Sequence, residues 1–480
     1  MAGILLHPTS LPGPGMQGTL GMDALRFIEF LHAAGIKVWQ MLPLGQPHMD
    51  GSPYQCMSVH AGNIQLICPR TLHQWGWIGE PTDFGGRYRN PFDCELLKQA
   101  HAGFLAHASE GDRAGFEAFV HDNAHWLEDY VLYLAFKGEH GGAPWWDWPA
   151  ERRDRDAAVL RKAVKRLAST LQQHRFEQYV FYRQWADLKR QANALDIQLF
   201  GDMPIFVAHD SSDVWAHRHL FDLDATGHPN IVTGVPPDYF SDTGQRWGNP
   251  HYDWQAMEAD GFAWWRERLR GQLEFNDLIR IDHFRGFESS WAIPSHEPTA
   301  VNGWWVPAPG EALFGSLYED LGHLPLVAED LGIITPEVEA LRDRFHLPGM
   351  KILQFAFEGG AKNPYLPHNH IANCVVYTGT HDNDTTLGWF RSCEPALQQH
   401  VLDYLGEPRE EMPWPLVREA FASVAQLAVV PMQDVLALDG EHRMNTPGTC
   451  DDNWRWRFHW DMVSPDLPAQ LRHLVETYGR

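Results

Sequence analysis

Short apolar segments that end in polar or charged residues recur along the chain. Each is rich in β-branched and aromatic residues and has the length of a strand that is buried on both faces. They are Ala2–His7, Ile36–Pro43, Ile197–Pro204, Leu278–His283, Pro325–Asp330, Met350–Phe357, Cys374–Asp382 and Leu427–Gln433. The pattern therefore predicts eight strands, with polar residues gathered at their C-terminal ends.

Helical patterns lie between most of these strands. In one of them, the apolar residues that recur at the spacing of a helix face are Leu160, Val164, Leu167 and Leu171. Thr335, Pro336 and Glu337 combine an N-cap residue, a first-turn proline and an acid at the start of another helix. Alternating strands and helices predict an α/β fold, a parallel (β/α)8 TIM barrel. Its active site would lie at the C-terminal strand ends.

Two intervals are too long for a single crossover helix. Residues 54–196 carry several helical stretches and predict a mostly helical insertion after the second strand. Residues 210–276 predict a second insertion, loop-rich at first and helical around Trp264 and Leu269. Its loop, residues 234–250, is rich in Gly, Pro and aromatic residues, which is typical of functional loops. We expect residues 1–480 to form one catalytic barrel domain that contains both insertions.

Composition narrows the classes of function. The chain has 480 residues, of which 38 are Lys or Arg and 62 are Asp or Glu, so its formal charge is −24. This charge argues against nucleic-acid or anionic-membrane partners. No apolar run approaches a spanning helix, and the first residues lack a signal-peptide pattern. The six cysteines show no C-x-x-C pair. We therefore expect a soluble cytoplasmic protein.

Carboxylates stand at three of the predicted strand ends. They are Asp282 on the fourth strand, Glu329 on the fifth and Asp382 on the seventh. Parallel strands would bring these side chains to one rim, where a pair of carboxylates suits glycoside chemistry, one as nucleophile and one as acid and base. Acidic residues at a barrel rim also bind metals, so a metal-dependent barrel enzyme is an alternative.

The fourth strand carries a second charge. Because side chains alternate along a strand, Arg280 and Asp282 share one face. A neighbouring cation would lower the pKa of Asp282 and keep it ionised, as a nucleophile must be. Glu329 must instead hold a proton at neutral pH, so we expect burial and nearby carboxylates to raise its pKa.

Aromatic and histidine residues suggest the substrate class. The chain has 21 tryptophans, and flat rings suit the apolar faces of pyranose sugars. Trp247 and Tyr239 lie on the long loop. His283 and His381 each follow or precede a rim aspartate without a metal-ligand spacing, so we expect them to bond sugar hydroxyls and expect no metal. No nucleophile elbow, phosphate loop or dinucleotide fingerprint occurs.

At these residues the sequence resembles the 4-α-glucanotransferases known as amylomaltases or disproportionating enzymes, relatives of the α-amylases. The similar motifs run in family order from end to end: GILLHPTSLPG, DGSPYQ, GDMPIFVAHDSSDVW, GVPPDYFSDTGQRWGNP, LIRIDHFRGF, AEDLG, GTHDNDTTLGW and RMNTPGT. The resemblance implies a barrel with insertions and no separate C-terminal β-domain.

The resemblance also implies roles for individual residues. Asp282 corresponds to the nucleophile, Glu329 to the general acid/base and Asp382 to a third carboxylate that stabilises the transition state. Residues expected at the substrate are Arg280, His381, Asp202, Tyr54, Ser52, Asp238, Tyr239, Trp247, Asn249, His283, Phe355 and Asn445. Among them, Tyr239, Trp247 and Asn249 belong to the loop that covers the acceptor, and Phe355 is an acceptor-side aromatic.

The implied reaction is a retaining transfer of α-1,4-glucan segments to the 4-hydroxyl of another glucan or of glucose. It needs no cofactor, and its partners would be maltooligosaccharides and fragments of starch or glycogen. We expect a monomer or a homodimer. An α-amylase-like hydrolase with the same carboxylates is one alternative, and an inactive glucan-binding protein is another.

Overall fold

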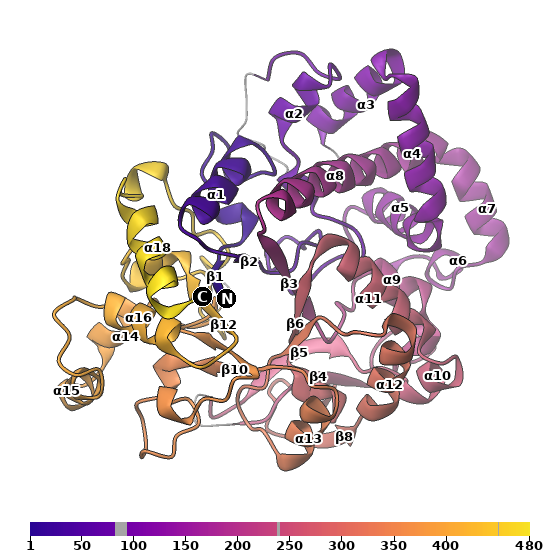
Figure 1. Cartoon of the computed structure of the whole chain (residues 1–480). Helices are drawn as coiled ribbons and strands as arrows, with labels where there is room; N and C mark the ends of the chain where they lie inside the picture. Colours follow the sequence, from indigo (N-terminus) through magenta and orange to yellow (C-terminus); the bar gives the residue numbers. More distant parts are fainter. Residues whose placement is uncertain (82–93, 238–240, 450) are drawn as a thin grey trace.

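A closed barrel of parallel strands forms the centre of the molecule (Figure 1). The structure is a computed structural model that describes residues 1–81, 94–237, 241–449 and 451–480. The barrel strands are β1 (Ala2–Leu5), β2 (Val38–Gln40), β3 (Gln198–Pro204), β6 (Leu278–Asp282), β9 (Leu326–Ala328), β10 (Gly349–Ile352), β11 (Cys374–Tyr377) and β12 (Leu427–Pro431). They pair in the order β10-β11-β12-β1-β2-β3-β6-β9. The backbone N–H of Ala328 donates to Pro348 O (2.9 Å) and joins the two ends. The predicted (β/α)8 fold is confirmed.

The barrel strands coincide with the predicted apolar segments, and all except β3 end before the segment does. Asp282 is the last residue of β6, Glu329 follows β9 directly, and Asp382 lies on the loop after β11. A parallel ladder stops where the chain must turn into the next helix, so the polar ends of the segments become rim loops. The rim that carries these loops is the one on which barrel enzymes place their active sites.

Helices surround the barrel (Figure 1). Between β2 and β3 the chain forms α2 (Pro69–Gln74), α3 (Glu95–His107), α4 (Glu110–Asp122), α5 (Ala124–Glu139), α6 (Ala150–Arg153), α7 (Ala157–Arg166) and α8 (Ala168–Ala194). The other helices are α1 (Met22–Ala33), α9 (Ser212–Ala216), α10 (Trp254–Ala259), α11 (Ala263–Phe275), α12 (Gly310–Leu321), α13 (Pro336–Arg344), α14 (Thr386–Ser392), α15 (Pro395–Tyr404), α16 (Trp414–Ala422), α17 (Met432–Val435) and α18 (Leu467–Tyr478). Among the described residues, no helix is long and apolar enough to cross a membrane.

Of two helix predictions, one agrees with the structure and the other does not. Helix α13 begins at Pro336 with Thr335 as its N-cap, as predicted. The leucine and valine pattern of residues 160–171 instead spans two helices, because α7 ends at Arg166 and α8 begins at Ala168. Leu167 lies between them with φ −97° and ψ 12°. Leu160, Leu167 and Leu171 still pack with the same core across this break, whereas Val164 is exposed.

A second sheet lies beside the barrel and was not predicted. Its strands β4 (Ile231–Val235), β5 (Gln245–Pro250), β7 (Ser289–Pro294) and β8 (Trp304–Pro307) pair antiparallel in the order β5-β4-β7-β8. The segment 234–250, expected to be a long loop, therefore contains strand residues at both ends. Its partner strand β7 arrives only after β6, and a local reading of the sequence does not reveal this long-range pairing.

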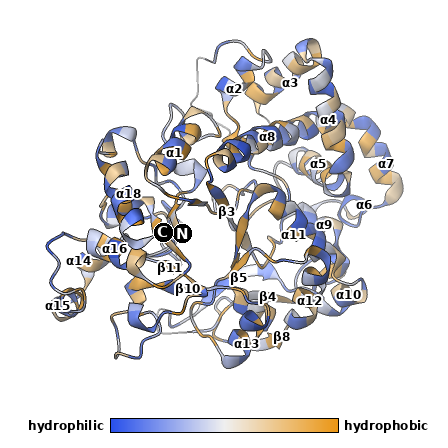
Figure 2. Cartoon of the chain, in the orientation of Figure 1, coloured by the Kyte–Doolittle hydropathy of each residue, from blue (hydrophilic) through white to orange (hydrophobic). Residues whose placement is uncertain are grey.

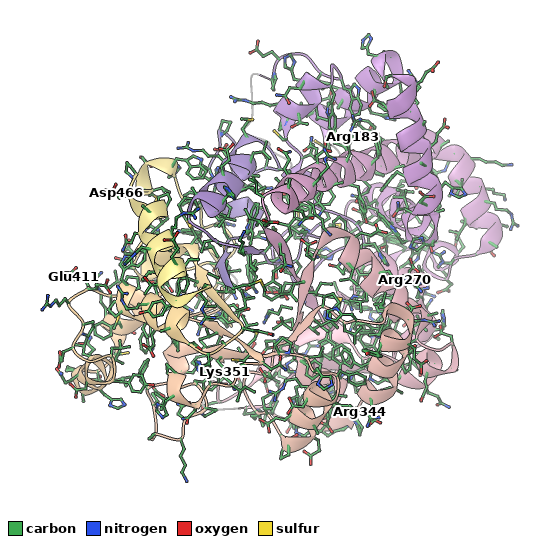
Figure 3. All side chains as sticks on the ribbon, viewed as in Figure 1. Arg183, Arg270, Arg344, Lys351, Glu411 and Asp466 are labelled. Atoms are coloured by element: carbon green, nitrogen blue, oxygen red, sulfur yellow. The ribbon has the colours of Figure 1, made fainter. Side chains whose placement is uncertain are left out.

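The interior of the barrel below the rim is apolar. Its wall residues include Val38, Phe200, Val327, Val375 and Val429, all fully or almost fully buried. In Figure 2 the central strands are mostly hydrophobic, whereas outer helices such as α7 and α18 carry both colours. Charged residues outside the rim, such as Glu411 and Asp466, are exposed and lie at the periphery of the molecule (Figure 3). The burial of apolar side chains between β-strands and helices is what holds the rim residues in place.

Two valines offer a matched test of this core. Val429 on β12 is 0% exposed and Val424 is 62% exposed. We predict that Val429→Ala lowers the free energy of unfolding by about 2 kcal/mol, through lost burial and a small cavity. Val424→Ala should change it by less than about 0.5 kcal/mol. Urea unfolding of both variants measures the difference, and equal effects would contradict the assignment of Val429 to the core.

Candidate active site

Arg280 occupies the centre of the rim. It lies on β6 directly beside Asp202 of β3, because the two residues are partners in the parallel ladder. Its Nη1 donates to Asp202 Oδ2 (2.7 Å) and its Nη2 donates to Asp282 Oδ1 (2.9 Å). Nη2 also lies 4.0 Å from Glu329 Oε2. One buried guanidinium therefore connects three carboxylates from neighbouring strands.

Asp282 and Glu329 face each other across this arginine. The alternation along β6 points Arg280 and Asp282 into the barrel, while Ile279 and Ile281 pack outward. Glu329 accepts backbone N–H bonds from His283 to Oε2 (2.6 Å) and from Leu331 to Oε1 (3.0 Å). The side chain of Asp282 is 28% exposed and that of Glu329 is 12% exposed. Both carboxyls are thus held in place and remain partly accessible to solvent.

A chain of polar contacts leads from Arg280 to the third carboxylate. Tyr54 donates its hydroxyl to Asp202 Oδ2 (2.7 Å), and the same hydroxyl lies 2.8 Å from His381 Nε2. That nitrogen is 3.3 Å from Asp382 Oδ2. Asn445 Nδ2 donates to Asp382 Oδ1 (2.6 Å). Residues far apart in the sequence therefore meet around one side of the site.

Trp247 of β5 extends the site toward the small sheet. Its ring meets the His283 ring edge-on, with 4.8 Å between centroids and 89° between planes. Asn249 is buried, accepts from Gln55 Nε2 (3.2 Å) and donates to Val207 O (2.9 Å). These bonds attach β5 to the segments that follow β2 and β3. Two of the predicted site residues, Asp238 and Tyr239, lie outside the described residues.

Ser52 and Phe355 lie at the edges of the cluster. The hydroxyl of Ser52 accepts from the backbone N–H of Tyr54 (3.3 Å) and so shapes the loop that presents the tyrosine. Phe355 ends a 3₁₀ turn after β10 and packs edge-on against Tyr365, with 5.6 Å between ring centroids. It lies with the apolar residues that line the top of the barrel.

Comparison with known proteins agrees with this geometry. A family model described as 4-alpha-glucanotransferase matches residues 6–463. The chain belongs to this family. A 4-alpha-glucanotransferase of Thermus thermophilus is 52% identical, over 100% of this chain and 98% of that protein. A 4-alpha-glucanotransferase of Synechocystis sp. is 47% identical, over 100% of this chain and 98% of that protein. The enzyme class predicted from the sequence is confirmed.

A solved structure gives the same result for the fold. The amylomaltase from Streptococcus agalactiae in complex with acarbose superposes with a TM-score of 0.94 at 36% identity. The match covers 100% of this chain and 99% of that chain. The barrel and the elements inserted into it are therefore those of a 4-α-glucanotransferase.

Sequence reasoning did not single out every residue of this glucanotransferase site. Trp454 has a positive φ of 66°, and its ring lies against Tyr54 (5.8 Å between centroids) and His381 (6.1 Å). Arg443 Nη2 donates to the backbone carbonyl of Asp382 (3.0 Å). Both residues come from the segment after β12, close in sequence to Asn445. For Arg443 the signal was its place in the motif RMNTPGT, and for Trp454 it was an aromatic ring a few residues after that motif.

The electrostatics of the nucleophile candidate differ from our expectation. Burial raises the pKa of Asp282 to about 8, although Arg280 acts to lower it. The negative charges of Asp202, Glu329 and Asp382 add to the rise. Arg280 therefore acts in the predicted direction, but the prediction that it keeps Asp282 ionised is wrong for the free enzyme, because one arginine serves both Asp202 and Asp282 and cannot outweigh desolvation.

The pKa of Glu329 follows the expectation. Burial raises it, while Arg280 and the two backbone N–H groups act in the opposite direction. Two such neighbouring carboxyls titrate as a pair. Because Arg280 Nη2 is nearer to Asp282 (2.9 Å) than to Glu329 (4.0 Å), its charge favours the form with the proton on Glu329.

Among the described residues, no group of three or more His, Cys, Asp or Glu could hold a metal ion.

The pH dependence of activity tests this account of Asp282. Its acid limb should rise as the nucleophile ionises. Asp202→Asn removes a charge that raises the pKa of Asp282, so we predict that the limb moves by about one unit to lower pH. The measurement is kcat/KM against pH with an activated maltosyl fluoride donor. Asp382→Asn removes a charge that raises the pKa of Asp282 less than Asp202 does, so it should move the acid limb by a smaller amount. An acid limb that moves to higher pH in Asp202→Asn would contradict this explanation.

Proposed function

We propose that this enzyme transfers α-1,4-glucan segments by a double displacement in which Asp282 is the nucleophile and Glu329 is the acid and base. The supporting observation is the position of their oxygens around Arg280 Nη2, at 2.9 and 4.0 Å, which keeps them within about 7 Å of each other. Retaining enzymes place the two carboxyls about 5 to 5.5 Å apart, and inverting enzymes leave about 6.5 to 9.5 Å for a water molecule. An upper limit of about 7 Å excludes most of the inverting range and is compatible with retention.

In the first step Asp282 Oδ attacks the anomeric carbon of the donor. The bond from that carbon to the leaving-group oxygen breaks, and Glu329 gives its proton to that oxygen. The reducing-end fragment leaves, and the remaining glucan is held as an ester on Asp282. The protonated state that Glu329 needs is supplied by its burial.

In the second step the 4-hydroxyl of an acceptor glucan attacks the same carbon. Glu329, now ionised, takes the hydroxyl proton, and the ester bond to Asp282 breaks. The α-linkage is restored. Water can replace the acceptor and would give hydrolysis, so transfer dominates only if the acceptor is bound in position. Trp247, whose ring contacts His283 next to the nucleophile, is our candidate for that platform.

The remaining polar residues would hold the sugar at the cleavage point. Asp382, oriented by Asn445, and His381, oriented by Tyr54, present acceptor and donor groups toward ring hydroxyls. Burial lowers the pKa of His381, so it binds as a neutral ring. Hydrogen bonds that strengthen as the ring flattens would stabilise the oxocarbenium-like transition state.

The cellular setting is proposed on chemical grounds. Cys56, Cys68, Cys374 and Cys393 are free thiols. Free thiols persist in a reducing cytoplasm, where maltooligosaccharides and fragments of starch or glycogen would serve as substrates.

Incubation with maltotriose in the presence of a chelator tests the proposed reaction. We predict glucose together with maltopentaose and longer chains, with little net gain of reducing ends. Asp282→Ala should lower the rate by more than about a thousandfold while the circular dichroism spectrum stays unchanged. Products shorter than the donor alone, with reducing ends rising at each cleavage, would indicate a hydrolase, and loss of activity in chelator would indicate a metal-dependent enzyme.

A further inference from the structure

His283, the residue after the proposed nucleophile, has an unusual backbone. Its φ of 52° and ψ of 52° lie in the left-handed region, which non-glycine residues seldom adopt. Such conformations persist only where the surroundings hold them, and they often mark functional sites. The question is what this chain gains from the turn.

The turn holds the acid/base through its backbone. The N–H of His283 donates to Glu329 Oε2 (2.6 Å), and the next N–H, that of Phe284, donates to Glu329 O (3.1 Å). A strand that continued straight past Asp282 would alternate these two N–H groups to opposite sides. The left-handed residue therefore lets consecutive N–H groups fix both the side chain and the backbone of Glu329.

The same residue supports the acceptor side through its ring. Its imidazole meets Trp247 edge-on at 4.8 Å and lies 6.4 Å from the Phe206 ring, centroid to centroid. Its Nε2 is buried without a hydrogen-bond partner among the described residues. Burial also lowers the pKa of His283 to about 4, so the ring is uncharged. The contacts with Trp247 and Phe206 are the observations that support a packing role for the ring.

We propose that His283 is a positioning residue that couples the acceptor platform to the general base: its backbone fixes Glu329, its ring supports Trp247, and it thereby sets the ratio of transfer to hydrolysis. The inference rests on the proposed function, in which Glu329 takes the proton from the acceptor hydroxyl.

The two outcomes of the second step depend on His283 differently. For transfer, the acceptor O4 bonds to the anomeric carbon, its proton passes to Glu329, and the ester bond to Asp282 breaks. The oxygen must then reach both the carbon and Glu329 while its sugar rests on Trp247. Hydrolysis, in which water attacks the ester, requires Glu329 in the same position but does not require Trp247. Loss of the ring should therefore weaken transfer selectively, since small displacements of a bound reactant are costly.

Asparagine and phenylalanine variants separate the two parts of the residue. Asparagine accepts the left-handed conformation and keeps the N–H to Glu329 but removes the ring. We expect His283→Asn to lower transfer more than hydrolysis, so that the transfer-to-hydrolysis ratio falls by about tenfold while the acid limb of the pH profile keeps its position. His283→Phe keeps the ring without its nitrogens and should retain the wild-type ratio.

A second left-handed histidine provides the matched control. His346 has φ 55°, is exposed, and follows α13, which ends at Arg344. His346→Asn and His346→Phe should leave rate and ratio unchanged. Trp247→Ala should lower the ratio as His283→Asn does, and the double variant should show little further loss, because both changes remove one coupled element.

The product analysis uses maltotriose and follows longer chains and reducing ends together. Equal loss of transfer and hydrolysis in His283→Asn would overturn the proposal in favour of a structural role. A His283→Phe variant that behaves like His283→Asn would overturn it in favour of a hydrogen bond from the ring. A wild-type enzyme that makes no chains longer than its donor would instead refute the proposed function itself, and the coupling with it.

Discussion

The site depends on one buried guanidinium. Arg280 is only 4% exposed, and removing a cation from water is costly unless charged partners compensate. Here Asp202 and Asp282 both bond to it, and Glu329 stands 4.0 Å away. Because Asp202 and Arg280 are neighbours in the β3–β6 ladder, the barrel itself fixes this contact. The spacing of the two reacting carboxyls follows from the geometry of a single side chain.

The rest of the site extends from that arginine in two directions. On one side, contacts through Asp202 and Tyr54 connect Arg280 to His381, Asp382 and the segment after β12, which would bind the donor sugar. On the other side, contacts through Glu329 and the turn at His283 connect it to Trp247 and the small sheet, which would receive the acceptor. In the proposed function, the donor side is therefore built on loops of the barrel and the acceptor side on the small sheet, and the two sides meet at Glu329.

The sequence predicted features that depend on local order and missed those that depend on long-range partners. Alternation along LIRID correctly placed Arg280 and Asp282 on one face, and the strand ends correctly brought Glu329 beside them. The antiparallel pairing of β4 with β7 was missed because β6 lies between them in the chain. Trp454 was missed because its positive φ and its neighbours arise only in the fold. The pKa of Asp282 was predicted in the wrong direction, since residue order shows the nearby arginine but not the depth of burial.

The central claim is that Asp282 carries the glucan between the two half-reactions. Mass spectrometry of a Glu329→Gln variant mixed with maltosyl fluoride tests it directly, because fluoride leaves without an acid while the ester then lacks the base that would release it. The account predicts that, after proteolysis, the peptide containing Asp282 gains the mass of one maltosyl group. An unmodified Asp282 peptide during continued turnover, or a sugar found on another residue, would contradict it.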